Sequence, residues 1–333
     1  MLEAKKQVAG EEGSFLFKLK ITALVAVVFL LLLLPVIAGP YLIHMMIWIF
    51  LYAYLGQCWN ILGGYVGQLS FGHALFYGVG AYTSTLFFIH LGLTPWVGMF
   101  IGALLAGSLG LFISYLGFHF GLRSHFFALC TIAFAEIFRL FADTIQSVGA
   151  AQGLLVPLKG DAPFLFQFIG KTPFYFIALA MMLISMGIVY LLQKSKLGSY
   201  FIAIRENEDA AKALGVNTVM YKSMAGGISA FLTAFGGSFY AQYSLYIDPG
   251  GTFGIMTSVT ILLNPIIGGM GTILGPFLGS LLLTPLSEII QDLVGVGRSG
   301  VHMMIYGAIL MAACIGIPNG LLPYIKQKLQ ANQ

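Results

Sequence analysis

The sequence predicts an all-α polytopic membrane protein with about ten transmembrane helices and one short helix outside the membrane. Of its 333 residues, 59% are hydrophobic and only 8% are charged, and the mean hydropathy is +0.92. A chain of this composition lacks the polar residues needed to cover a water-soluble domain of the same length. Apolar runs separated by Pro, Gly or charged residues give the expected spans, which are 21–39, 41–62, 70–90, 95–117, 125–142, 174–193, 222–243, 253–270, 273–292 and 301–321.

The basic residues indicate how these spans are oriented. The net charge of +4 is spread over short loops and termini, so it does not form the basic face of a nucleic-acid-binding protein. If the basic segment 1–20 is cytoplasmic, an even number of spans puts the charged loop 194–222 and the tail 324–333 on the same side, and the loop 143–173 outside. A cleaved signal peptide is the alternative for the first span, but the long polar segment before it favours a retained anchor.

The loop 194–222 is the longest charged passage between two apolar segments, and it predicts a short helix over 208–214. Asn207 is a suitable N-cap residue and Gly215 a suitable helix stop. Glu208 and Asp209 lie in the first turn, and Lys212 follows four residues after Glu208. A helix of about two turns is marginal alone, so we expect its small residues to lie against another surface. The alternatives are a solvated loop and a docking helix for a soluble partner.

A glycine-rich run over 61–81 carries the polar side chains Gln68, Ser70 and His73 at membrane depth. So many glycines permit close backbone approach or an interrupted helix. Polar groups at this depth are tolerated mainly where they face protein or a water-filled cavity, so the functional interpretation is a translocation path. The alternative is tight helix packing in which a neighbour satisfies His73.

Asn264 precedes Pro265, which removes a backbone donor at membrane depth. This dipeptide predicts either an opened helix whose carbonyls face the translocation path or a simple kink. The run that follows has glycine at Gly271, Gly275 and Gly279, a spacing typical of membrane helices in close contact.

Glu136 and Arg139 lie three residues apart within an expected span, so they share one face of a helix. Ionisable residues within a membrane are costly unless they pair and face protein or water. We predict an ion pair here, acting either at a gate or as a structural lock. The loop 143–173 that follows is rich in Gly and Pro, which favours a folded connection over a helix.

Several chemistries have no counterpart in the sequence. Cys58, Cys130 and Cys314 lie in separate apolar runs and match no metal-binding spacing, so we expect no metal site. The sequence has no G-x-x-x-x-G-K-[ST] motif for nucleotide phosphates and no H-E-x-x-H or G-x-S-x-G motif, so we expect no enzyme activity. An ion-coupled secondary carrier is an alternative, with Glu136 as its most obvious intramembrane acid.

Three motifs make the chain similar to a known family. They are GQLSFGHALFYGVGAYT, the run FFALCTIAFAEIFRL, and AIRENEDAAKALGVNTVMYK with the following SAFLTAFGGSFYAQ. The chain resembles the LivM-type permease of branched-chain amino acid ABC transporters. The likeness extends from about Gly63 to the PNGL at 318–321.

The resemblance implies that 21–323 is the permease domain of an inner-membrane importer that moves branched-chain or other hydrophobic amino acids. It implies a second, LivH-like permease, two LivG- and LivF-like cytoplasmic ATPases that use the ATP, and a periplasmic amino-acid-binding protein, with no cofactor in this chain. Urea and short amides are alternative solutes within the same class. The resemblance also implies an ATPase-coupling role for the short helix and its flanks, which comprise Arg205, Glu206, Asn207, Glu208, Asp209, Ala210, Ala211, Lys212, Ala213, Leu214 and Gly215.

Overall fold

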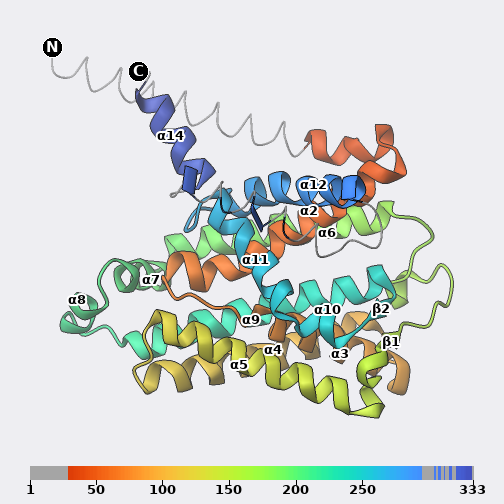
Figure 1. Cartoon of the computed structure of the whole chain (residues 1–333), viewed down its shortest axis with the longest axis horizontal. Coiled ribbons are helices and arrows are strands. Elements are labelled where there is room, and N and C mark those ends of the chain that lie inside the picture. Colours follow the sequence, from red (N-terminus) through yellow and green to blue (C-terminus); the bar gives the residue numbers. More distant parts are fainter. Residues whose placement is uncertain are drawn as a thin grey trace.

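The computed structural model describes residues 29–294 and 320–331, together with positions 304, 307, 308, 311, 315 and 316. The expected segment 1–20 and Cys314 lie outside the described residues, as do parts of the spans expected at 21–39 and 301–321. The described part is almost entirely helical (Figure 1). Its helices are α2 (Pro40–Asn60), the π-helix η1 (Ile61–Tyr65), α3 (His73–Leu91), α4 (Pro95–His119), α5 (Ser124–Thr144), α6 (Thr172–Lys194), α7 (Lys196–Glu206), α8 (Glu208–Ala213), α9 (Thr218–Ser244), α10 (Pro249–Phe253), α11 (Ile255–Gly268), α12 (Gly275–Val294) and α14 (Leu321–Ala331).

In this part of the chain, six helical segments are long and apolar enough to cross a membrane. Helices α9 and α12 occupy the spans expected at 222–243 and 273–292. The prediction of an all-α polytopic protein is therefore confirmed, and the total of about ten spans stays a prediction. The six segments are Pro40–Tyr65, His73–Leu91, Pro95–His119, Ser124–Thr144, Thr172–Lys194 and Pro249–Gly268.

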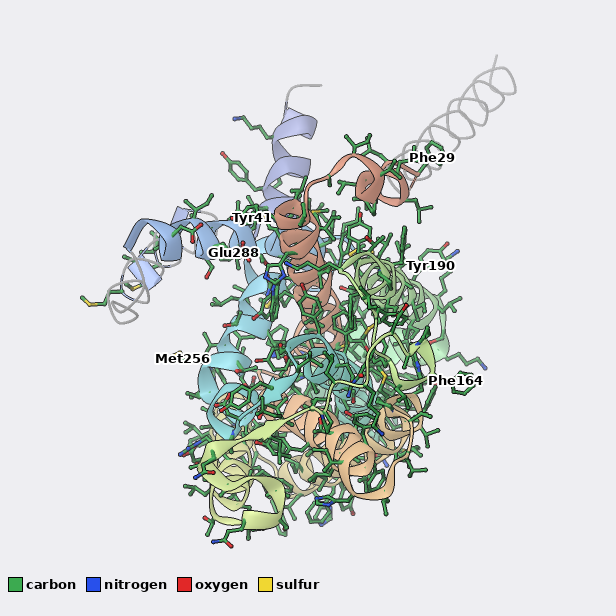
Figure 2. All side chains as sticks on the ribbon, turned by 90° about the vertical axis from the view of Figure 1, so that its right-hand side faces the viewer. Phe29, Tyr41, Phe164, Tyr190, Met256 and Glu288 are labelled. Atoms are coloured by element: carbon green, nitrogen blue, oxygen red, sulfur yellow. The ribbon has the colours of Figure 1, made fainter. Side chains whose placement is uncertain are left out.

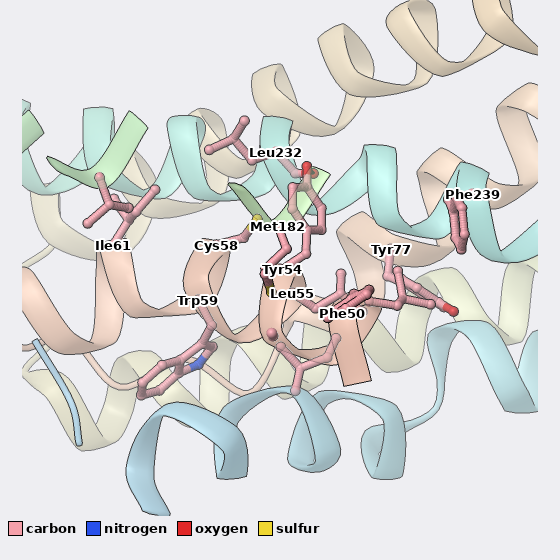
Figure 3. Close-up of a cluster of buried hydrophobic side chains, with 14 of the residues drawn as sticks. Phe50, Tyr54, Leu55, Cys58, Trp59, Ile61, Tyr77, Met182, Leu232 and Phe239 are labelled. Atoms are coloured by element: carbon pink, nitrogen blue, oxygen red, sulfur yellow. Dashed lines mark hydrogen bonds between the residues drawn. The ribbon is translucent and has the colours of Figure 1, made fainter. Parts of the chain in front are cut away.

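Helix α2 forms the centre of the bundle. With η1, it has 72% of its most apolar stretch buried, against 33% for α6 and 28% for α5. Helices α6, α9, α11 and α12 pack around it. Figure 3 shows Phe50, Tyr54 and Trp59 of α2 among the buried side chains of this core. The hydroxyl of Tyr54 donates to the carbonyl of Leu232 on α9 at 2.5 Å. This buried hydroxyl therefore has a hydrogen-bond partner.

Glycines let neighbouring helices cross at backbone contact distance. A Cβ atom added to Gly80 of α3 would lie 2.1 Å from a backbone oxygen of α9, and one added to Gly237 of α9 would lie 1.8 Å from a backbone oxygen of α3. At the crossing of α11 and α12, a Cβ atom on Gly279 would lie 1.9 Å from the carbonyl oxygen of Asn264. A larger residue at any of these positions forces the helices apart. The close packing predicted from the glycine spacing is therefore confirmed at Gly279.

The glycine-rich run interrupts the helical path between α2 and α3. Helix α2 continues into η1, and residues 66–72 then reach His73 without forming a helix. Gly67 has a φ of +75° in this break, a conformation that residues with a Cβ atom rarely adopt. Helix α7 packs against η1, so the break lies at the same end of the bundle as α7 and α8. This end is named the α8 end, and the opposite end, which carries β1 (Leu154–Leu155) and β2 (Tyr246–Ile247), is named the β end (Figure 1).

The connection between α5 and α6 lies at the β end and is folded, as the sequence predicts. It contains the 3₁₀ turns η2 (Gln146–Val148), η3 (Ala150–Gln152) and η4 (Pro163–Leu165), and its strand β1 pairs antiparallel with β2. Gln167 is buried and ties the loop together. Its Oε1 accepts from the backbone amide of Lys159 at 2.7 Å, and its Nε2 donates to the carbonyl of Pro157 at 2.8 Å.

Candidate functional site

Three capped helix starts fold the loop 194–222 into a compact unit at the α8 end. The hydroxyl of Ser195 accepts from a backbone amide at 3.2 Å and starts α7. The side chains of Asn207 and Asn217 accept from backbone amides at 3.0 and 3.1 Å and start α8 and α9. Asn207 is the cap that the sequence predicts.

Helix α7 was not expected from the sequence, and it changes the grouping of two candidate residues. Arg205 and Glu206 form the end of α7 and not the lead-in to an isolated coupling helix. Helix α8 covers Glu208–Ala213, and Leu214 is its C-cap. The candidate coupling residues therefore belong to the end of α7, to α8 and to the residues that cap and stop α8.

Helix α8 ends in a Schellman motif at Gly215. Gly215 has a φ of +85°, and its amide donates to the carbonyl of Lys212 at 2.9 Å. The amide of Val216 donates to the carbonyl of Ala211 at 3.1 Å, so both bonds satisfy carbonyls at the helix end. A Cβ atom on Gly215 would meet nothing within 4 Å. Glycine is therefore required here by the backbone conformation and not by lack of space.

Glu208 joins α8 to the first turns of α9. Its Oε1 lies 2.8 Å from Nζ of Lys222, 3.0 Å from Nζ of Lys212 and 3.2 Å from Oγ1 of Thr218. The side chain of Lys222 is 5% exposed and that of Glu208 is 30% exposed. Nζ of Lys222 also lies 4.4 Å from the ring centroid of Phe118, near the end of α4. The pair of Glu208 with Lys212 follows the predicted spacing, whereas the buried partner Lys222 is found only in the structure.

The two lysines keep Glu208 ionised. Partial burial raises the pKa of the Glu208 carboxyl, but the hydrogen bonds and charges of Lys222 and Lys212 outweigh burial and hold that pKa below its usual value. Glu208 is therefore a carboxylate at neutral pH. A charge pair with one buried member, and not an apolar face alone, holds α8 against the bundle.

The side of α8 that points away from the bundle is exposed. Ala211 faces inward and is 2% exposed. Ala210 and Ala213 are exposed, and Leu214 is 85% exposed. Asp209 and Lys212 are exposed beside them, so the exposed side of α8 combines small, apolar and charged side chains.

Arg205 connects α7 to the interrupted helix. Its Nη1 donates to the carbonyl of Gly64 in η1 at 3.0 Å. Just before η1, Oδ1 of Asn60 accepts from the amide of Gly271 at 2.8 Å, and its Nδ2 donates to the carbonyl of Thr272 at 2.9 Å. Hydrogen bonds therefore link α7 through η1 to the turn between α11 and α12.

The polar side chains beside the interruption are buried, and Ser70 and His73 are bonded to each other. Ser70 Oγ lies 3.2 Å from Nδ1 of His73, and Nε2 of His73 lies 2.7 Å from Oγ of Ser229. Ser229 donates to the carbonyl of Cys58 at 2.7 Å, so it accepts from His73. Gln68, Ser70 and His73 are all buried. This arrangement corresponds to the packing alternative, and a role in lining a translocation path stays a prediction.

Helix α11 stays closed around Asn264. It runs from Ile255 through Pro265 to Gly268, and Nδ2 of Asn264 donates to the carbonyl of Thr260 at 2.7 Å. Asn264 is 2% exposed, and its Oδ1 has no hydrogen-bond partner among the described residues. The structure thus contains a proline within a continuous helix and not an opened helix at this position.

Glu136 and Arg139 form an ion pair, and Asp143 extends it. Nη2 of Arg139 lies 2.5 Å from Oε1 of Glu136, and Nη1 lies 2.6 Å from Oδ2 of Asp143. The side chains of Glu136, Arg139 and Asp143 are 46%, 28% and 26% exposed. The network therefore lies on the outer face of α5 and not in the interior of this chain. Its function as a gate or a lock stays a prediction.

Some residues of the candidate site were not predicted from the sequence, and only one of them has a local signal that could have indicated it. Asp143 stands four residues after Arg139, so helical spacing would have added it to the pair. Lys222 stands at the start of an apolar run, where nothing local distinguishes a buried lysine from a solvated one. The contact of Arg205 with Gly64 joins positions 141 residues apart and has no local signal.

Comparison with known proteins decides the family. The sequence profile of the family described as "Branched-chain amino acid transport system / permease component" matches residues 41–314. The chain belongs to this permease family. Such a permease is a membrane-embedded transport subunit that is not itself catalytic and that acts within a transporter complex.

Curated relatives carry the same kind of name. The high-affinity branched-chain amino acid transport system permease protein LivM of Escherichia coli (strain K12) is 27% identical over 303 residues, covering 84% of this permease and 69% of the relative. LivM of Salmonella typhimurium is 26% identical over the same shares of both chains. The autoinducer 2 import system permease protein LsrC of Klebsiella pneumoniae is 29% identical over 127 residues, covering 37% of this permease and 36% of the relative. No solved structure matches the permease significantly.

Proposed function

We propose that this chain is the permease subunit of an ATP-binding cassette importer for branched-chain or other hydrophobic amino acids. The observation that carries the proposal is the family match over 41–314, and the LivM relatives support it. The sequence contains no phosphate-binding loop, so ATP would be bound and hydrolysed by separate subunits. This chain itself needs no cofactor for that role.

The proposed partners are a second, LivH-like permease, two LivG- and LivF-like ATPases and a periplasmic amino-acid-binding protein. The α8 end would face the cytoplasm, where the ATPases are, and the β end would face the binding protein. This orientation follows from the basic loops of the sequence and puts both termini in the cytoplasm of a cell with the permease in its inner membrane.

The exposed side of α8 is the proposed docking surface for an ATPase. The small side chains of Ala210 and Ala213 would let α8 fit into a groove on the partner. Leu214, which is 85% exposed, would add an apolar contact. Because Glu208 fixes α8 to Lys222 of α9, a movement of the ATPase would move α9 as well. Arg205 would carry the same movement to η1, and the spans would then alternate between two openings of the path.

Reconstitution of the complete complex tests the proposal. The permease, the second permease and both ATPases are placed in proteoliposomes with ATP on the ATPase side and the binding protein on the other. We expect labelled leucine to accumulate only when all subunits and ATP are present, and the permease alone to hydrolyse no ATP. ATP hydrolysis by the pure permease, or leucine uptake without ATPases, would contradict the proposal. Uptake of labelled urea without leucine would assign the alternative solute.

A further inference from the structure

A cavity of about 480 Å³ lies at the β end, between the ends of α2, α6 and α9 and the folded connection that joins α5 to α6. Helix α2 contributes His44 and Trp48 to its wall, and α6 contributes Phe174. The rest of the wall comes from 242–245, at the end of α9, and from residues between 158 and 171. This cavity is named the β-end pocket. Its volume is in the range of small-molecule sites, and one chain forms all of it.

Aromatic rings form the apolar wall of the β-end pocket. The ring centroid of Tyr243 lies 5.2 Å from that of Phe174 and 6.0 Å from that of Trp48. Phe168 adds a further ring, whose centroid lies 5.3 Å from that of Phe174. Because packed rings keep one another in place, they offer a preformed surface to an apolar side chain.

The hydrogen bonds of this wall leave Tyr243 with a hydrogen to donate. Nε1 of Trp48 donates to Nε2 of His44 at 3.3 Å. Since an indole N–H can only donate, Nε2 of His44 accepts, and the neutral imidazole carries its hydrogen on Nδ1. Nδ1 in turn donates to the hydroxyl oxygen of Tyr243. The hydroxyl of Tyr243 therefore keeps its own hydrogen, which it can donate to a bound molecule.

Gln242 is a buried polar side chain of the β-end pocket without partners. It is 1% exposed, and neither the oxygen nor the nitrogen of its amide has a hydrogen-bond partner among the described residues. Gln167 also lines the pocket, but both of its amide atoms are bonded within the loop. A buried amide without partners destabilises a protein. Gln242 therefore favours a ligand that offers it both a donor and an acceptor.

Charges of both signs border the β-end pocket. Lys171 is the charged residue of its lining, and it is exposed. Figure 2 shows Glu288 of α12 beside Tyr41, whose hydroxyl donates to it. Glu288 does not line the pocket, but its charge acts on both His44 and Tyr243. A bound carboxylate would be attracted by Lys171, and a bound ammonium by Glu288.

We propose that the β-end pocket binds the zwitterion of a hydrophobic amino acid. The inference rests on the proposed function and gives this chain an amino-acid site of its own at the end that would face the binding protein. The carboxylate of the ligand accepts from the hydroxyl of Tyr243 and from Nε2 of Gln242, and its ammonium donates to Oε1 of Gln242. Its apolar side chain packs against Trp48 and Phe174.

Competition binding tests the class of ligand. The complete complex in lipid nanodiscs, without ATP and without the binding protein, is titrated with labelled L-leucine. The competitors are 4-methylpentanoate, which lacks the amino group of leucine, and 3-methylbutylamine, which lacks its carboxylate. We expect each to compete at least ten-fold more weakly than leucine itself. Equal competition by either one, or no saturable binding to a complex that takes up leucine when ATP and the binding protein are added, would overturn the site and leave the proposed function intact.

Removal of the amide tests whether leucine binds in this pocket. Gln242→Leu removes a buried amide that has no partner, so the empty complex should unfold at a higher temperature. Its affinity for leucine should nevertheless fall by about ten-fold or more, because two hydrogen bonds to the ligand are lost. Tyr243→Phe keeps the ring and removes the donated hydrogen, and it should lower the affinity as well.

Gln57→Leu of α2 is the matched control. Gln57 is equally buried, and its amide atoms also have no partner in the described part of the chain, but it does not line the β-end pocket. This variant should leave the affinity for leucine unchanged. Native affinity in both Gln242→Leu and Tyr243→Phe, or an equal loss in Gln57→Leu, would overturn the proposal.

Discussion

Nζ of Lys222 lies 2.8 Å from Oε1 of Glu208, and the lysine is the more buried member of the pair, at 5% exposure against 30%. The two charges are therefore not equivalent. If the lysine is removed, Glu208 keeps Lys212 and some water. If the carboxylate is removed, the ammonium of Lys222 is left buried with no counter-charge among its described contacts, which are Glu208 and the ring of Phe118.

This asymmetry predicts that Glu208→Gln damages the permease more than Lys222→Met. A buried charge without its partner costs about 3 kcal/mol or more, whereas loss of one hydrogen bond from a carboxylate that keeps another costs about 1 kcal/mol. Thermal unfolding of the purified permease and capture of the ATPases measure the effect. Asp209→Asn is the control for unfolding, because Asp209 is 96% exposed and should leave the melting temperature unchanged. Equal losses for the first two variants would show that the pair is not buried as described.

The lowered pKa of Glu208 predicts a loss of the α8 anchor in acid. A carboxyl whose pKa is lowered by folding contributes stability above its usual pKa, and this contribution disappears as the pH falls through the lowered value. The usual value is near 4.5, so the anchor should be constant from pH 7 to about pH 5 and weaken below that. A spin label on Leu214→Cys should become more mobile below pH 4.5 in the native sequence. The same label in Glu208→Gln should be mobile at every pH, and an unchanged profile in that variant would contradict the assignment.

Local signals predicted α8 correctly because its ends depend on nearby residues. Asn207 caps an amide three residues ahead, and Gly215 stops the helix by its own backbone conformation. The boundaries of the membrane-length helices were predicted within a few residues for the same reason, since Pro, Gly and charge end an apolar run.

Local signals could not predict long-range contacts, nor which side of a helix is left exposed. The sequence left both a path and packing open for Ser70 and His73. The position of Ser229, 156 residues from His73, shows that His73 is bonded inside the bundle. The pair of Glu136 and Arg139 was expected from spacing, but the side of α5 that α3, α4, α10 and α11 leave exposed depends on the tertiary arrangement. Helix α7 was not predicted because Gly198 and Ser199 weaken its helical pattern. The Ser195 cap and the contacts of Phe201 and Ile204 with the core stabilise this helix in the structure.

Gly215→Val should weaken the α8 unit through the backbone alone. Valine disfavours the positive φ of this position by about 1 kcal/mol or more, and its Cβ atom would meet no neighbouring atom within 4 Å. Gly215→Asn should retain most of the uptake, because asparagine tolerates the left-handed conformation. Gly187→Ala of α6 is the control, since its added Cβ atom also meets no atom within 4 Å but its φ is not positive. Leucine uptake at matched permease content measures the effect, and equal activity of the valine and asparagine variants would contradict the explanation.

Bulk on the outward side of α8 should uncouple the ATPases without unfolding the permease. Ala210→Trp and Ala213→Trp place a ring on exposed positions, so the permease should insert and melt as the native protein does. Capture of the ATPases should fall at least ten-fold, because a rigid helix end cannot enter a groove with a ring on its surface. Ala151→Trp, at an exposed position of the β end, should leave ATPase capture unchanged. If Ala210→Trp captures the ATPases and takes up leucine as the native protein does, α8 is not a docking surface and only connects two membrane helices.

The charge network of α5 predicts a graded response to charge reversal. Glu136→Arg or Arg139→Glu alone puts like charges side by side and should lower the yield of the assembled permease pair. Reversing both restores the first pair but leaves a carboxylate at position 139, four residues before Asp143, so recovery should be incomplete. Adding Asp143→Lys restores both attractions and should recover more, as expected for coupled neighbours. The yield of second permease purified with this chain measures assembly, and losses that simply add across the three positions would show that the network does not act as a unit.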